Sequence, residues 1–131
     1  MDEISAHFRK GVELFNRGDF FEAHEEMEDA MNLIGDDASD RDAGDWEFFL
    51  GLLRAAVAHH QIGERNLPGA ILHLRAALKF LAAYPDRHRG LKLRELRAAL
   101  TAQLARLEAS EPPLSAPRIE MAATASADDK L

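Results

Sequence analysis

The sequence predicts an all-α protein: a compact bundle of about five helices, followed by a disordered C-terminal tail. Apolar residues recur at helical spacing in five stretches of the 131-residue chain. Polar loops and helix-ending residues separate these stretches. A weak internal repeat, in which Asp19 corresponds to Asn66 and Met27 to Leu74, indicates two similar helical hairpins plus a closing helix.

The first two predicted helices cover residues 4–16 and 20–34, and Arg17-Gly18 separates them. Asp19 is predicted to cap the second helix, because Glu22 follows it at the spacing of a capping box. Their predicted core-facing residues recur every three or four positions: Ile4, Phe8, Val12, Phe15, Phe20, Ala23, His24, Met27, Met31 and Ile34.

The third predicted helix covers residues 46–62, with Asp42 or Asp45 as its cap, and its glycine, Gly51, would permit a close helix crossing. Its predicted core-facing residues are Trp46, Phe49, Leu50, Leu53, Ala56, Val57 and His60. Together with Phe21 and Phe48, these residues exceed what one helix face can bury. Two interpretations stay open: a central helix buried nearly all round, or an apolar stripe left uncovered for self-association or partner docking.

Asn66 is predicted to cap the fourth helix, with Pro68 in its first turn, where a missing N–H has no cost. Tyr84-Pro85 ends this helix, and the fifth covers residues 91–107. From Ser110 onward apolar periodicity is absent. The predicted division is therefore a helical bundle domain over residues 1–109 and a disordered tail over residues 110–131.

Composition limits the functional classes. The absence of cysteine excludes disulfides, thiolate metal sites and cysteine nucleophiles. The acidic N-terminus lacks the apolar segment of a signal peptide. The most apolar stretch is interrupted by Arg54, His59 and His60, whereas a membrane span needs about 20 largely apolar residues. We therefore expect a cytoplasmic protein with no membrane partner.

Charge is unevenly distributed. Residues 1–47 contain 15 acidic residues against 4 Lys/Arg, a net charge of −11, and residues 48–109 contain 4 against 10, a net charge of +6. Such halves complement each other within one molecule or between subunits. A basic run from Arg87 to Arg97 raises the possibility of phosphate binding, but the aromatic residues that stack on bases are not interleaved with it. We therefore favour a homo-oligomer or a protein partner over nucleic acid.

Two blocks of the sequence resemble a known family. One is Phe15-Asn16-Arg17-Gly18-Asp19-Phe20-Phe21-Glu22-Ala23-His24-Glu25, followed by Glu28; the other combines Gly51-Leu52-Leu53, Ala56-Val57-Ala58-His59-His60, Asn66, Gly69-Ala70, Leu74, Ala77-Leu78 and Tyr84-Pro85. Over about residues 8–92 the chain resembles the family called domain of unknown function 309. The resemblance implies a small all-helical bundle with no established activity. The family usually has Trp at Met31 and Gln at Leu50, so a polar site that relatives possess could be altered here.

The residues that could carry chemistry are His24, Glu25, Glu28, His59 and His60. His24 and Glu28 are four positions apart and share a helix face. Imidazole and carboxylate groups at a helix–helix contact suit a divalent metal such as zinc, iron or manganese. The same groups also suit a polar core network, in which each histidine is neutral and hydrogen-bonded. Adjacent residues on a helix point about 100° apart, so His59 and His60 cannot easily face one ion.

The sequence shows no zincin pattern, no Glu-x-x-His pair, no phosphate-binding glycine loop and no serine–histidine arrangement. It identifies no substrate, so whether the chain is an enzyme stays open, and no cofactor is required. We predict a protein-interaction or structural module. The alternative is a metal- or small-ligand-binding protein, hydrolytic or not, that uses the His/Glu site.

Overall fold

A computed structural model describes residues 2–35 and 40–122. Its helices are α1 (Glu3–Asn16), α2 (Phe20–Leu33), α3 (Asp40–Ala43), α4 (Trp46–Gly63), α5 (Leu67–Leu81) and α6 (Leu93–Glu108). Two short strands, β1 (Arg87–His88) and β2 (Leu91–Lys92), form an antiparallel hairpin before α6. The prediction of an essentially all-α bundle is confirmed.

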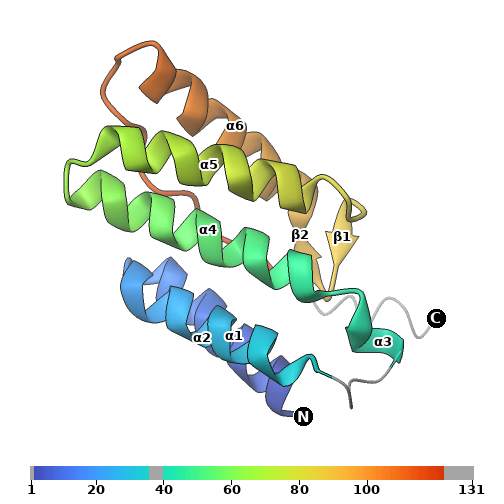
Figure 1. Ribbon diagram of the computed structural model, residues 1–131. Coiled ribbons are helices and arrows are strands. Elements are labelled where there is room, and N and C mark those ends of the chain that lie inside the picture. Colours follow the sequence, from blue (N-terminus) through green and yellow to red (C-terminus); the bar gives the residue numbers. More distant parts are fainter. Residues whose placement is uncertain (1, 36–39, 123–131) are drawn as a thin grey trace.

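The helices form a layered arrangement with α4 at its centre (Figure 1). Helix α4 packs between α2 and α5, while α1 packs on α2 and α6 packs on α5. The chain that follows α6 passes behind α4, between α1 and α6 (Figure 1). In the described part of the chain, none of these helices is long and apolar enough to cross a membrane.

The internal repeat is visible in the turns. Gly18 and Arg65 both have positive φ angles, of 84° and 61°. In both turns the next residue donates its N–H to a carbonyl five residues earlier: Asp19 to Leu14 and Asn66 to Gln61, each at 2.9 Å. The α1–α2 and α4–α5 hairpins therefore share one turn geometry, as the sequence repeat predicts.

Two predicted caps behave differently. The Asn66 side chain accepts the N–H of Gly69 at 3.1 Å and caps α5 as predicted. Asp19 occupies the N-cap position of α2 but its side chain accepts no capping hydrogen bond, so the predicted capping box is not formed. Its carboxylate lies 3.6 Å from the Arg17 guanidinium instead.

Gly51 permits the close α4–α5 contact that the sequence predicts. A Cβ atom at this position would lie 2.7 Å from the side chain of Leu81, which is fully buried. Since real Cβ contacts are essentially never this short, a larger residue would displace the Leu81 side chain or the helix that carries it.

The prediction of a disordered tail does not hold for residues 110–122, which form an extended strap. The Asn16 amide exchanges two hydrogen bonds with the backbone of Ile119, at 2.9 and 2.7 Å. The Gln103 amide does the same with Leu114. Ile119 itself is 2% exposed. Apolar periodicity missed the strap because one apolar anchor and two distant amides hold it. Residues 123–131 lie outside the described residues.

Candidate functional site

Helix α4 presents an apolar stripe to the outside of the molecule. Its core-facing side includes Phe48, Leu52, Ala55 and His59, all buried. On the opposite side, at spacings of three and four, lie Trp46, Leu50, Leu53 and Val57, and none of these four is buried. We call them the outer stripe. Trp46 is 46% exposed.

The outer stripe corrects the predicted orientation of this helix. Of the residues predicted to face the core, Phe49 and Ala56 are fully buried, but Trp46, Leu50, Leu53, Val57 and His60 are not. Because the helix is apolar on nearly every side, periodicity alone does not show which side faces the core. The residues in excess of what the core holds remain on the surface.

Phe21 lies next to one end of the outer stripe. This residue is 50% exposed, and its ring contacts two predicted site residues: the ring of His24 at 4.8 Å and that of His60 at 5.6 Å. The His24 ring nitrogen Nδ1 also lies 2.5 Å from the Phe21 carbonyl oxygen. His24 and His60 therefore form an aromatic cluster with Phe21.

The other predicted site residues do not join this cluster. Glu25 and Glu28 are exposed on α2. His59 points the other way, into the core, where the rings of Phe15 and Phe20 contact it at 5.6 and 5.5 Å. No three of the five predicted residues have ligand atoms within 4.8 Å of one another among the residues that the structure describes.

A different set of residues meets that distance criterion. His7 on α1 and Glu26 and Asp29 on α2 have potential ligand atoms within 4.8 Å of one another. His7 Nδ1 lies 2.8 Å from the Glu26 carboxylate and 3.9 Å from that of Asp29. The first distance is that of an ordinary hydrogen bond, which satisfies the imidazole without an ion.

On the side of α4 that faces α5, the helix carries a cation, Arg54. Arg54 Nη1 lies 3.0 Å from Nδ1 of His73 on α5. Partial burial, and next the positive charge of Arg54, lower the pKa of His73 below its ordinary 6.5. The Arg54 Nε atom is buried and has no hydrogen-bond partner among the described residues. This guanidinium is therefore paired with a neutral imidazole and not with a carboxylate.

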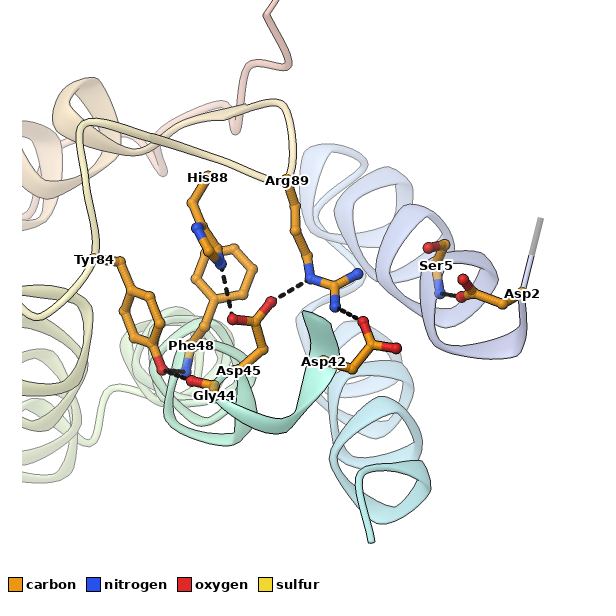
Figure 2. A network of polar contacts seen from close by, with 9 residues as sticks. All are labelled: Asp2, Ser5, Asp42, Gly44, Asp45, Phe48, Tyr84, His88 and Arg89. Carbon is orange, nitrogen blue, oxygen red and sulfur yellow. Dashed lines mark hydrogen bonds and ion pairs between the residues drawn. The ribbon is translucent and has the colours of Figure 1, made fainter. Parts of the chain in front are cut away.

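A polar cluster joins the β1–β2 hairpin to the start of α4 (Figure 2). Arg89 donates from Nε to the Asp45 carboxylate at 2.5 Å and from Nη2 to Asp42. His88 Nε2 contacts the other Asp45 oxygen at 2.9 Å. The Tyr84 hydroxyl donates to the Gly44 carbonyl at 2.7 Å, and burial, more than the nearby carboxylates, raises the pKa of Tyr84.

A pocket of about 600 Å³ opens beside this cluster, lined by Ser5, Phe8, Arg9, Asp45, His88, Arg89 and Met121. The cluster uses part of the basic run that the sequence marked as a possible phosphate site. Arg89 is bound to two carboxylates, and Arg97 is bound to Asp86 and to the carbonyls of Leu81 and Tyr84. Arg89 therefore attaches the hairpin to the residues before α4, and Arg97 holds the turn that follows α5.

Sequence reasoning did not assign these clusters because their members are far apart in the chain. Asp45 and Arg89 are 44 residues apart, and His7 and Glu26 are 19 apart. The available signal was the surplus of acidic residues before α4 and of arginines after α5, which indicates attraction but no specific pair.

A known family and an uncharacterized relative share sequence with this chain. Residues 8–72 match the family described as domain of unknown function DUF309. An uncharacterized protein from Aquifex aeolicus (strain VF5) is 34% identical over 99 residues, which is 76% of this chain and 28% of that protein. The chain therefore spans less than a third of the length of this relative. These matches confirm the resemblance predicted from the two sequence blocks: over residues 8–72 the chain is similar to the family called domain of unknown function DUF309.

Proposed function

We propose that the chain is a cytoplasmic protein-interaction module that binds a protein on the outer face of α2, α4 and α5. The observation that carries this proposal is the outer stripe: Trp46, Leu50, Leu53 and Val57 line one side of the central helix without being buried. A contiguous apolar surface of this kind on a small soluble domain marks an interaction site.

The surroundings of the stripe resemble the anatomy of a protein interface. Exposed aromatic side chains lie at the two ends of the apolar stripe, Trp46 at the start of α4 and Phe21 beside His60. Such side chains dominate binding energy when a partner buries them. Charged residues surround the stripe, with Glu25 and Glu28 on α2 and Lys79 on α5 exposed. An apolar centre with a polar rim is the usual arrangement at such interfaces.

The alternative, a metal or small-ligand site built on His24, Glu28 and His60, has weaker support. Such a site requires each ligand atom within about 2.0–2.2 Å of one ion. The rings of His24 and His60 pack against Phe21 instead. The absence of cysteine fits a reducing compartment and therefore supports the cytoplasmic location.

Site-specific photo-crosslinking tests the proposal. A photoreactive phenylalanine at Val57, in the full chain and in the native host, is expected to yield a discrete protein adduct. The same residue at Ala102, exposed on α6, serves as the control. The adduct at position 57 should disappear with Leu50→Glu, which places a charge in the outer stripe. Equal adducts at both positions, or none at position 57, would contradict the proposal.

A further inference from the structure

We propose that the protein bound by the outer face is a second copy of this chain. In this dimer the two-fold axis runs along α4, and α2 of each copy lies against α5 of the other. The inference rests on the proposed function and specifies the partner. Three observations support it: the charge pattern across the face, an arginine that forms no ion pair with the carboxylates that the structure describes, and the size of the face.

Charge changes sign across the outer face. On one side of the outer stripe, α2 exposes Glu25 and Glu28. Asp29 is also exposed, but it lies toward His7 of α1. On the other side, α5 exposes Lys79, and Arg54 of α4 lies against His73 of α5. Arg75 of α5 pairs with Glu108 of α6 and therefore lies toward α6.

These opposite charges cannot neutralise each other within one copy. Helix α4 separates α2 from α5 (Figure 1). Two interaxial spacings of about 8–10 Å place the charged rows roughly 16–20 Å apart. Charges in solvent are screened beyond about 8 Å at physiological salt. A second copy that brings α2 over α5 shortens this separation to that of a direct ion pair.

Arg54 supplies the second argument. Its guanidinium donates to a neutral imidazole and forms no ion pair with the carboxylates that the structure describes. A partly buried cation in this state is costly unless a carboxylate reaches it. In the proposed dimer the acidic row of the partner's α2 lies over this edge.

The charge pattern also selects the symmetry. A face that binds itself does so about a two-fold axis lying in the plane of contact. An axis that runs along α4 places α2 over the partner's α5 and makes the two α4 helices parallel. An axis perpendicular to α4 places α2 over α2 and brings like charges together. The first arrangement is therefore the favoured one.

The face is large enough for a stable dimer. Helix α4 has 18 residues and is therefore about 27 Å long. Three neighbouring helices spaced by about 8–10 Å cover a width of roughly 25–30 Å. The resulting area of roughly 700–800 Å² per copy is close to the ~800 Å² that each partner contributes to a standard interface.

Charge reversal with mixing tests the proposal. Light scattering after size exclusion should give twice the chain mass of 14.6 kDa for the native protein. The variant Glu25→Lys/Glu28→Lys should be monomeric, and so should Arg54→Glu/Lys79→Glu, because each brings like charges together. An equimolar mixture of the two should regain the dimer. Arg94→Glu/Ala102→Glu on α6 controls for altered net charge and should stay dimeric.

Cysteine crosslinking tests the symmetry, since the chain contains no native cysteine. Positions 46 and 57 lie about 16 Å apart along α4. With parallel α4 helices, each position faces itself across the axis. Under mild oxidation, the Trp46→Cys variant should therefore form a disulfide between its two copies, and so should the Val57→Cys variant. If instead only a mixture of the two variants crosslinks, the axis is perpendicular to α4 and the proposed arrangement is overturned.

A native protein that stays monomeric at about 100 μM, or a mixture that stays monomeric, would overturn the second copy as partner. A different experiment, photo-crosslinking at position 57, tests the proposed function. A photo-crosslinked adduct at Val57 with the mass of two copies supports both proposals, and an adduct of another mass retains only the interaction function. The absence of any adduct contradicts the proposed function itself.

Discussion

His59 connects the core of the molecule to its C-terminal strap. Its Nδ1 lies 2.9 Å from the Ala55 carbonyl and therefore carries the hydrogen, which leaves Nε2 as an acceptor. Nε2 faces the Gln103 amide nitrogen at 3.4 Å, and that nitrogen donates to the Leu114 carbonyl at 2.9 Å. The hydrogen bonds are all satisfied only while the imidazole is neutral, since a protonated Nε2 would face another donor.

Stability should therefore fall in mild acid. Burial lowers the pKa of His59 below 6.5, although its hydrogen bond to Ala55 acts in the opposite direction. As pH falls below 6.5, the unfolded chain binds a proton that the folded chain does not. The free energy of unfolding therefore decreases, by at most about 1.4 kcal/mol per pH unit, until the folded-state pKa is reached.

Urea unfolding at pH 7, 6 and 5 measures this dependence. His59→Gln, which keeps a neutral polar side chain, should show a shallower decrease than the native protein. His73 also has a lowered pKa, but it is present in both proteins and does not affect the difference. Identical pH dependence in the two proteins would show that His59 does not carry the effect.

At the scale of elements, the strap covers the side of α4 that faces away from the outer stripe. The side-chain amides of Asn16 and Gln103 bind its backbone, and its end extends the β1–β2 hairpin. The Lys92 N–H donates to the Glu120 carbonyl at 2.8 Å, and Leu91 pairs with Met121. The strap is therefore part of the fold, and one side of α4 is covered by the chain itself while the other is not.

Two alanine substitutions in the strap should lower the free energy of unfolding by very different amounts. Ile119 is fully buried, so Ile119→Ala should lower the free energy of unfolding by about 2–5 kcal/mol. Leu114 is 41% exposed and its hydrogen bonds use only the backbone, so Leu114→Ala should cost less than about 0.5 kcal/mol. Denaturant unfolding measures both, and equal costs would mean that the strap does not pack as described.

At the scale of the whole molecule, charge organises both the interior and the surface. Acidic residues are in excess before α4 and basic residues after it. Inside the molecule these two groups meet where Arg89 bridges Asp42 and Asp45. This contact fastens the hairpin to the start of α4. Glu25, Glu28 and Lys79 stay exposed on the outer face, where they are available to a partner.

Breaking the internal bridge should be costly. Arg89→Met removes the guanidinium that bridges two buried carboxylates and should lower the free energy of unfolding by about 3–5 kcal/mol. Arg87→Met, in the same hairpin, removes an exposed arginine that forms no ion pair with the described residues, and should cost less than about 0.5 kcal/mol. Thermal unfolding of both variants is the measurement. A small loss in Arg89→Met would show that the cluster is not structural.

The sequence by itself determined the five long helices, their order, the repeated hairpins and the family resemblance. These depend on periodicity, capping and turn residues, which are local. The short helix α3 and the β1–β2 hairpin, which replaces the predicted start of the last helix at residue 91, were not predicted. The sequence also indicated a surplus of aromatic residues, Trp46, Phe48, Phe49 and Phe21, of which Phe48 and Phe49 are fully buried. It further indicated that His59 and His60 point in different directions.

Only the tertiary structure decided which side of α4 is outside, which histidine is buried and what Arg89 binds. It also showed that residues 110–122 pack against the bundle. Each of these depends on partners brought together from distant parts of the chain: Asn16 and Ile119 are 103 residues apart. A helix that is apolar on every side fits a core in more than one orientation, so its neighbours select the orientation. That selection leaves Trp46 exposed and the rest of the outer stripe only partly buried.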